Sequence, residues 1–216
     1  MENKKVSKSV LKRLPGYLAY LKNMPENSPP NISATALANA LGMGEVQVRK
    51  DLAMVSDGGR PKIGYLREAL IDDIEQFLGY DNTTDAILIG AGKLGQALMG
   101  YSGFDEYGLN ILAAFDAKPK MTRTEEGKPV YPIEKLPQFC KSHKVLMGII
   151  TVPAEGAQSV ADQLIAVGVK AIWNFAPVHL DVPAGTLVQN ENMATSLAVL
   201  SVHLQAQIKE EKEIKK

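Results

Sequence analysis

The clearest chemical pattern in this chain is a set of three glycines, Gly90, Gly92 and Gly95, spaced as Gly-x-Gly-x-x-Gly directly after the apolar run 87–89. In this pattern the first glycine permits a tight turn from strand to helix, the second lets the backbone approach a pyrophosphate, and the third lets the helix pack against the sheet. The helix N-terminus adds free N–H groups. The spacing therefore predicts a dinucleotide site; the alternative is an α/β turn without a ligand.

A carboxylate follows where such a site needs one. Asp116 ends a second apolar run, 111–115, about 20 residues after the glycines, where an acid hydrogen-bonds to a ribose 2′-hydroxyl. Because a carboxylate repels a 2′-phosphate, Asp116 favours NAD over NADP, although the nearby Lys118 and Arg123 weaken that preference. The alternative is an aspartate that merely ends a strand.

The other apolar runs predict further strands of one parallel sheet. Runs 144–153 and 169–177 are typical of buried parallel strands, with a helix expected over 154–167 between them. Ligands bind at the carboxyl ends of the strands in such a sheet. The residues expected to line the same pocket are Thr151, Val152, Pro153, Asn174, Phe175 and Ala176. The stretch 174–177 could instead be a simple turn that ends its strand.

Two short helices joined by a glycine-containing turn are predicted over 33–41 and 45–55, with Ser33 as N-cap and Gly42 as the stop signal. This is the helix-turn-helix pattern. In the second helix the apolar positions are Val46, Val48, Leu52 and Val55. The polar residues left to project are Gln47, Arg49 and Lys50. Gln and Arg suit base edges and Lys suits phosphate, so the pattern favours DNA binding; the alternative is a helical hairpin with a solvated polar face.

The segments around these helices extend the DNA-binding interpretation. Residues 56–65 predict a small hairpin with its turn at 57–59, a wing on which Arg60 and Lys62 would reach a phosphate or the minor groove. A helix over 66–78 and a polar domain boundary at 79–85 are expected next. Residues 1–70 hold eleven Lys and Arg against six Asp and Glu, a formal charge of +5, which indicates modestly a nucleic-acid partner.

The two ends of the chain each carry an apolar helix pattern. A helix over 7–24 contains Pro15, so it either starts near Leu14 or bends at the proline. Over 192–208 apolar residues recur at spacings of four and three, which resembles a short heptad seam. That seam consists of Met193, Leu197, Leu200, Leu204 and Ile208. It packs either on its own domain or on a partner subunit, which a symmetric DNA reader would need.

The bulk composition is that of an ordinary globular protein of 216 residues, with 45% hydrophobic and 22% charged residues and no net formal charge. No apolar run is long enough to span a bilayer, and the N-terminus has no secretory pattern. Cys140 is the one cysteine, which excludes an intrachain disulfide and fits a cytoplasmic protein. The three histidines are scattered, so no metal site is expected.

Several motifs, in their order along the chain, together resemble the Rex family of bacterial redox-sensing transcriptional repressors. The match covers nearly the whole chain. The motifs are Arg13-Leu-Pro-x-Tyr17, Gln47-Val-Arg-Lys-Asp-Leu52, Gly64-Tyr65, Gly90-Ala-Gly92-x-Leu94-Gly95, Ala114-Phe-Asp116, Thr151-Val-Pro153-Ala and Asn174-Phe-Ala-Pro177-Val.

This resemblance implies a homodimer that binds inverted-repeat operators, is released from DNA by NADH, and represses fermentation and respiration genes when NADH is scarce. It adds Arg13 and Tyr65 to the DNA-binding residues, and Ala91, Lys93, Leu94 and Tyr101 to the NAD(H)-binding ones. Three departures affect this expectation. Ala19 and Asn192 stand where many members carry the Arg and Asp of a cofactor-sensing network, and Arg60-Pro61-Lys62 replaces a glycine-rich arginine wing.

The sequence thus predicts an α/β protein with three parts. They are a winged helix-turn-helix domain over 1–80, a Rossmann-type parallel-sheet domain binding NAD(H) over 85–190, and a dimerisation helix over 191–216 that is exchanged between subunits. The favoured function is a non-enzymatic repressor that senses the NADH/NAD⁺ ratio on double-stranded operator DNA, with no membrane partner. The alternatives are a small NAD-dependent oxidoreductase, which would need a proton donor and a substrate chamber, and a coenzyme A-binding Rossmann protein.

Overall fold

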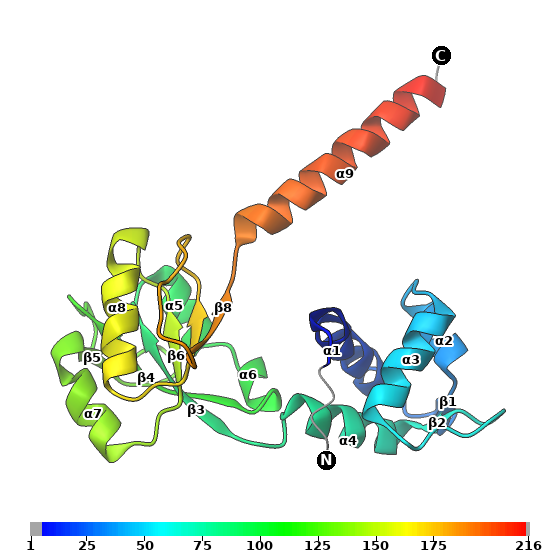
Figure 1. Cartoon of the computed structure of the whole chain (residues 1–216), viewed down its shortest axis with the longest axis horizontal. Helices are drawn as coiled ribbons and strands as arrows, with labels where there is room; N and C mark the ends of the chain where they lie inside the picture. Colours follow the sequence, from blue (N-terminus) through cyan, green and yellow to red (C-terminus); the bar gives the residue numbers. More distant parts are fainter. Residues whose placement is uncertain (1–5, 215–216) are drawn as a thin grey trace. The chain divides into compact units, whose positions relative to one another are not determined.

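The computed structural model describes residues 6–214 and divides the chain into two compact units, Met1–Asn82 and Thr83–Lys216 (Figure 1). The division falls within the polar stretch 79–85. α4 ends there at Gly79, whose left-handed backbone (φ 74°) stops the helix.

The N-terminal unit contains four helices and a two-stranded antiparallel sheet among the described residues. Its elements are α1 (Lys8–Lys22), β1 (Asn31–Ile32), α2 (Ala34–Ala40), α3 (Glu45–Val55), β2 (Tyr65–Leu66) and α4 (Arg67–Leu78). One apolar core joins the helices, and its fully buried side chains include Leu14, Tyr17, Leu37, Leu52 and Ile74. The Ser33 hydroxyl caps α2, and Gly42 follows its end in the left-handed conformation, as predicted.

The helix predicted over 7–24 is present as α1, which begins at Lys8, capped by Ser7, and runs through Pro15, so of the two alternatives the start near Leu14 is excluded. One prediction for α3 needs correction. Val46, predicted as an apolar core position of α3, is 65% exposed, whereas Val48 and Leu52 are fully buried. Val46 lies in the first turn of α3, where the core-facing positions begin only with Val48.

The wing, defined here as residues 57–64, turns at a different place from the one predicted. Arg60 and Gly64 form an antiparallel bridge, so the chain reverses at Pro61–Ile63, not at 57–59. Lys62 occupies the tip in the left-handed region, with φ 65°. The Ser56 hydroxyl accepts a hydrogen bond from Gly58 N–H, and this local bend uses the glycines that suggested a hairpin turn.

The C-terminal unit is built on a six-stranded sheet in the described residues, with all strands parallel and in the order β5-β4-β3-β6-β7-β8. This is the order of a doubly wound Rossmann sheet. The strands are β3 (Thr84–Ile89), β4 (Leu109–Asp116), β5 (Val130–Pro132), β6 (Met147–Ile150), β7 (Ala171–Asn174) and β8 (Leu187–Asn190).

Alternating side chains of these strands bury both faces of the sheet. On one face Ile87 and Ile89 pack under α7 (Leu136–Ser142) and α8 (Ala154–Ala166). On the other, Ala86 and Leu88 pack under α5 (Lys93–Met99) and α6 (Gly103–Glu106). A short 3-10 helix, η1 (Ile133–Lys135), precedes α7. The order of the strands reverses at β3, which lies between β4 and β6. The crevice for a ligand is therefore expected at the carboxyl end of β3, directly before Gly90.

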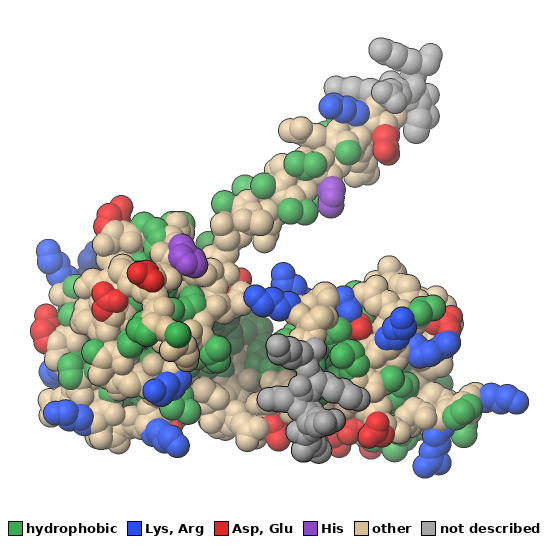
Figure 2. All heavy atoms as spheres, viewed as in Figure 1, with side chains coloured by type: hydrophobic (Ala, Val, Ile, Leu, Met, Phe, Trp, Pro, Cys, Tyr) green, Lys and Arg blue, Asp and Glu red, His purple; other side chains and the backbone are tan. Residues whose placement is uncertain are grey.

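The last helix, α9 (Met193–Ile214), leaves its apolar side chains uncovered within this chain. Every residue described in α9, from Met193 to Glu211, is exposed, including the five seam residues predicted from the sequence (Figure 2). The helix is longer than the predicted 192–208. The Asn192 side chain accepts a hydrogen bond from Thr195 N–H at 3.1 Å and so acts as its N-cap.

Candidate functional site

The three glycines lie in the turn between β3 and α5, and each has a different environment. Gly90 has φ 107°, and a Cβ there would lie 2.9 Å from the carbonyl carbon of Thr151 on the neighbouring strand end. A Cβ on Gly95 would overlap the Gly90 carbonyl oxygen at 2.0 Å. At Gly92 a Cβ would meet no protein atom within 4 Å. Gly90 and Gly95 are thus required by the fold, whereas Gly92 keeps its backbone open to an approaching ligand.

Side chains from two elements hold the turn in place. The Thr151 hydroxyl, just after β6, donates to the Gly90 carbonyl oxygen at 2.8 Å. Gln96 Nε2, on α5, donates to the Ala91 carbonyl oxygen at 2.8 Å. Both interactions engage carbonyl oxygens of the loop and so restrict its backbone. Gln96 was not among the predicted site residues. Its position in the sequence, directly after the third glycine, could have indicated that it lies at the turn.

Asp116 lies beside the glycine turn. One carboxylate oxygen accepts a hydrogen bond from Ala91 N–H and the other from Lys118 N–H, both at 2.8 Å. The half-buried carboxylate therefore joins the ends of β3 and β4 and retains lone pairs for a further donor, such as a ribose hydroxyl. Residues 91 and 116 come together because β3 and β4 are adjacent parallel strands that end in register.

The predicted pocket residues at the end of β7 divide into two groups. Asn174 is fully buried, and its amide donates to the carbonyl oxygens of Ala176 and Val178 and to Asn190 Oδ1, while its own oxygen accepts from Ala176 N–H. Ala176 is buried as well. These two residues were predicted to line the pocket, but Ala176 is buried and the Asn174 side chain is used within the strand-ending turn and by Asn190 of β8. Phe175 remains half-buried near the carboxyl edge.

The remaining predicted cofactor residues lie around the same edge of the sheet. Lys93 and Leu94 are exposed in the first turn of α5, Val152 is half-buried and Pro153 is exposed. Tyr101, after α5, is 53% exposed and makes an edge-to-face contact with Phe104, with ring centroids 4.9 Å apart. Exposed apolar and aromatic groups beside a glycine turn suit the flat ring of a nucleotide.

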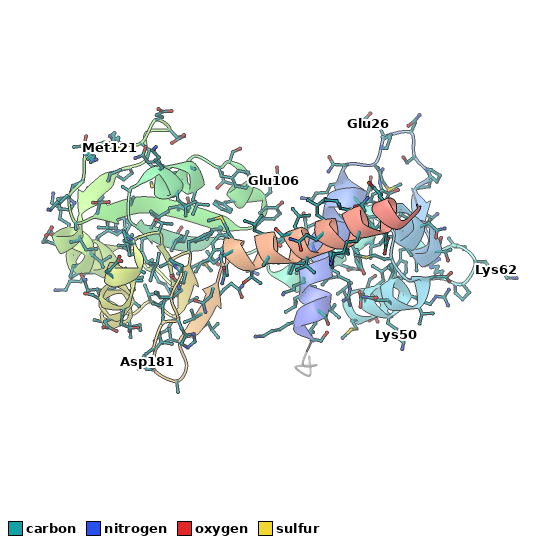
Figure 3. All side chains as sticks on the ribbon, turned by 90° about the horizontal axis from the view of Figure 1, so that it is seen from above. Glu26, Lys50, Lys62, Glu106, Met121 and Asp181 are labelled. Carbon is teal, nitrogen blue, oxygen red and sulfur yellow. The ribbon has the colours of Figure 1, made fainter. Side chains whose placement is uncertain are left out.

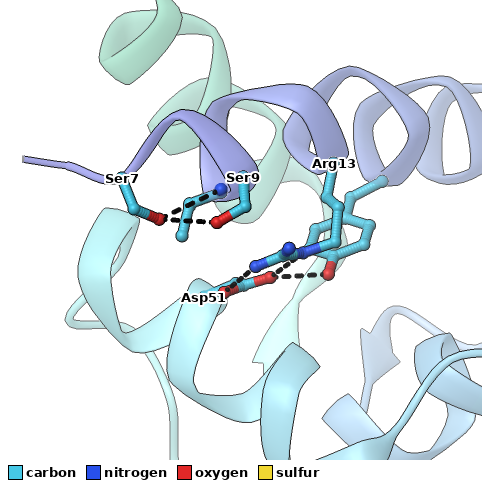
Figure 4. A network of polar contacts seen from close by, with 6 residues as sticks. Ser7, Ser9, Arg13 and Asp51 are labelled. Carbon is cyan, nitrogen blue, oxygen red and sulfur yellow. Dashed lines mark hydrogen bonds and ion pairs between the residues drawn. The ribbon is translucent and has the colours of Figure 1, made fainter.

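In the N-terminal unit, a buried carboxylate on α3 joins this helix to α1 (Figure 4). Arg13 donates to both oxygens of Asp51, from Nε at 2.7 Å and from Nη2 at 2.9 Å, and the Tyr17 hydroxyl donates to Asp51 at 2.8 Å. The Asp51 side chain is 4% exposed. Hydrogen bonding to Asp51 raises the pKa of Arg13 above its ordinary value, so the guanidinium stays charged.

This ion pair places cationic and amide groups on one face. Arg13, Gln47 and Lys50 line a shallow hollow of about 560 Å³, together with Ser9 and Gly44. The Gln47 amide lies against the Arg13 guanidinium, with its oxygen within 2.8 Å of Arg13 Nη1 when oriented to accept. Lys50 points away from the helices of its unit (Figure 3). Arg49 instead forms an ion pair with Glu45 of the same helix.

The wing carries two exposed cations, Arg60 and Lys62, and Lys62 projects from its tip (Figure 3). Tyr65, predicted to contact DNA, is 8% exposed and belongs to the apolar core. Its ring lies under the wing, where a Cβ on Gly59 would come within 2.7 Å of it. Burial raises the pKa of Tyr65. This residue therefore supports the wing and does not project from it.

Burial, and then the hydrogen bond to Asp51, raise the pKa of Tyr17 to about 12, from about 10 in an unfolded chain. Neutral Tyr17 thus contributes stability that is complete below about pH 10 and is lost as the pH rises towards 12. We expect the free energy of unfolding of wild type to fall more steeply over this window than that of Tyr17→Phe. Urea titrations followed by circular dichroism at several pH values test this, and parallel curves would contradict it.

Among the described residues 6–214, none of the helices combines the length and the hydropathy that a membrane span requires. Within the same residues, no cluster of three or more His, Cys, Asp and Glu side chains is placed to hold a metal ion.

Two family models match the chain, one in each unit. Residues 5–53 match a model described as "Putative DNA-binding protein N-terminus", and residues 81–178 match a model described as "CoA binding domain".

Full-length relatives combine both regions. The chain is 41% identical over 197 residues to a redox-sensing transcriptional repressor Rex of Porphyromonas gingivalis, covering 91% of this chain and 90% of the relative. It is 39% identical to a protein of the same name from Clostridium botulinum, covering 95% and 99%.

Solved structures are similar over nearly the full length of the chain. The structure is similar to that of RSP, described as a Rex-family repressor. For RSP in complex with NAD⁺ and operator DNA the TM-score is 0.87, with 33% identity and 99% of each chain covered. For RSP in complex with NADH the TM-score is 0.85, with 34% identity, covering 97% of this chain and 99% of that one.

Proposed function

Because this chain belongs to the Rex family of redox-sensing transcriptional repressors, we propose that it represses transcription by binding operator DNA and is released from the operator by NADH. The observation that carries the proposal is the presence in one chain of an open glycine turn beside Asp116 and a basic helix-turn-helix unit. NAD(H) is then a regulatory ligand that is bound and released unchanged.

The residues of the glycine turn fit a dinucleotide. The pyrophosphate would approach the backbone at Gly92, where no side chain intervenes, and the first N–H groups of α5 would donate to it. Asp116 would accept from the adenosine ribose. The nicotinamide end would then lie towards Thr151, Phe175 and Tyr101. When bound, the cofactor supplies a ring that is positively charged in NAD⁺ and neutral in NADH, and that difference is the signal.

On the DNA side, α3 would enter the major groove. Gln47 and Lys50 of α3 line the same hollow as Arg13 of α1, and Arg49 would exchange its exposed partner Glu45 for DNA. Arg60 and Lys62 would contact phosphate or the minor groove from the wing. A ligand in the other unit can change DNA affinity only if it binds the DNA-competent and the released states with different affinity.

The test is a titration of an inverted-repeat duplex, selected by the protein from a random pool, in the presence of each cofactor. We expect saturating NADH to weaken DNA binding and NAD⁺ to leave it nearly unchanged. Asp116→Ala should require more NADH for release while binding DNA normally without ligand. Arg49→Ala should bind DNA more weakly while binding NADH normally. Equal DNA affinity of the wild type with both cofactors would refute the redox-sensing function.

We also propose that the protein is a homodimer through α9. The helix exposes a seam that includes Leu197, Leu200 and Leu204, and an inverted-repeat operator calls for a two-fold symmetric reader. Leu200→Glu is expected to yield monomers by light scattering. Ala206→Glu, on the face of α9 opposite Leu197, should stay dimeric. A dimer that persists in Leu200→Glu would place the interface elsewhere.

The two alternatives, a coenzyme A-binding protein and a small NAD-dependent oxidoreductase, need separate tests. The match of residues 81–178 to the coenzyme A-binding model favours a coenzyme A ligand, whereas Asp116 beside the glycine turn favours an unphosphorylated ribose. The mass of the ligand retained after gentle purification distinguishes the two. We also propose that the protein is not an enzyme, which predicts no turnover of NADH with simple carbonyl compounds. Because its proposed target is operator DNA, we propose that it acts in the cytoplasm.

A further inference from the structure

The start of α9 is attached to the sheet by the segment 190–192. Glu191 N–H donates to the Asn174 carbonyl oxygen at 2.8 Å, and the carboxylate of Glu191 accepts a hydrogen bond from Trp173 Nε1 at 2.9 Å. Asn192 then caps the helix. Because the described residues of α9 are all exposed, these bonds determine the direction in which α9 leaves the unit.

Trp173, the one tryptophan of the sequence, has a second set of contacts, made by its aromatic ring system. Its ring contacts Phe175 with centroids 4.9 Å apart and Phe104 with centroids 5.6 Å apart. Phe104 in turn contacts Tyr101. Phe175 and Tyr101 lie at the edge of the sheet where the nicotinamide end of the cofactor is proposed to bind.

From these contacts we propose that Trp173 and Glu191 are positioning residues that transmit the state of the cofactor site to the orientation of α9. The inference rests on the proposed function and deepens it. A nicotinamide ring that displaces Phe175 acts on the indole directly, because the two rings are in contact, and one that displaces Tyr101 acts on it through Phe104.

The indole N–H and the carboxylate form a charge-assisted hydrogen bond that is partly shielded from water. When the indole rotates, Glu191 has to follow it or lose this bond. Glu191 directly precedes the N-cap of α9, so a small rotation at this point becomes a large displacement at the far end of a 22-residue helix. If α9 is the dimer helix, this displacement changes the spacing of the two DNA-binding units.

Three variants separate the parts of this connection. Trp173→Phe keeps an aromatic ring and removes the N–H donor, Glu191→Ala removes the acceptor, and Glu191→Gln keeps an acceptor oxygen without the charge. Glu155→Ala, an exposed glutamate on α8, serves as the control. For each full-length protein the measured quantity is the ratio of operator Kd with saturating NADH to operator Kd without ligand.

We expect Trp173→Phe and Glu191→Ala to reduce this ratio by about tenfold, a loss of coupling free energy between the two sites. Their affinities for NADH alone and for DNA alone should stay within about threefold of wild type, because neither residue is among those proposed to contact a ligand. Glu191→Gln should restore most of the ratio. A merely structural role would lower all affinities together and would not show this rescue.

Two results would overturn the inference. One is a wild-type ratio that is large and is unchanged in both Trp173→Phe and Glu191→Ala, which would refute the connection but leave the proposed function intact. The other is a ratio in Glu191→Gln that is no higher than in Glu191→Ala, because the hydrogen bond to Trp173 then does not carry the coupling. A wild-type ratio of one refutes the proposed function itself, and the inference with it.

Discussion

Asp51→Ala is expected to lower the free energy of unfolding of the N-terminal unit by about 3–5 kcal/mol, the usual cost of removing one partner of a buried ion pair. Asp51 is buried on α3, and its carboxylate accepts hydrogen bonds from Arg13 and Tyr17 on α1. The substitution leaves the mostly buried guanidinium of Arg13 without its counter-ion and the Tyr17 hydroxyl without its acceptor. Denaturant unfolding followed by circular dichroism measures the change.

The matched control is Glu45→Ala, which removes the other ion pair of α3. The Glu45–Arg49 pair is largely exposed, so its loss should cost less than about 1 kcal/mol. Operator binding gives a second readout. Asp51→Ala should weaken it in conditions where the protein remains folded, since Arg13 and Gln47 lose the anchor that holds them on one face. Equal destabilisation by the two substitutions would show that the Asp51 network contributes little to stability.

Gly92→Ala and Gly95→Ala are expected to separate the ligand function of the glycine turn from its structural function. The Gly92 backbone has φ −72°, which alanine adopts readily, and its Cβ would point into open space. Gly92→Ala should therefore leave the unfolding transition unchanged. Its affinity for NADH should fall about tenfold or more, or about 1.4 kcal/mol, because the methyl group occupies the approach of the pyrophosphate.

Gly95→Ala should affect both quantities. Its Cβ would lie 2.0 Å from the Gly90 carbonyl oxygen, so α5 has to move away from the sheet, at a cost of about 3 kcal/mol. Calorimetric NADH titration and thermal unfolding of both variants measure the two effects. If Gly92→Ala bound NADH as well as wild type does, the pyrophosphate would not lie over Gly92, and the cofactor would have to bind elsewhere.

The order of strands and helices could be predicted from the sequence because each depends on residues that are near one another in the chain. Ser33 and Gly42 delimit α2 through local hydrogen bonds and backbone conformation, and the apolar runs around Gly90 and Asp116 alternate with helices. Once β3 and β4 are parallel neighbours, the carboxylate of Asp116 necessarily lies near the glycine turn. The family resemblance rested on the same local motifs.

The predictions that needed correction depended on how a side chain is packed. Asn174 and Tyr65 have residue types suited to ligand and DNA contacts, yet both are buried, one inside a turn and the other under the wing. The wing turn was placed at the glycines of 57–59, although the reversal occurs around Lys62, which adopts a left-handed conformation without being glycine. Residue type alone does not distinguish these possibilities, because burial is decided by the neighbouring elements.

By itself, then, the sequence determined the glycine turn, its acidic partner, the helix-turn-helix and the apolar seam of α9, since each is encoded by spacing within a short segment. Only the tertiary structure decided which side chains meet across long separations. Arg13 reaches Asp51 over 38 residues and Trp173 reaches Glu191 over 18, and both contacts arise from the packing of separate elements. Hydrogen bonds of this kind need two groups at a distance of about 3 Å, and that distance depends on the whole fold.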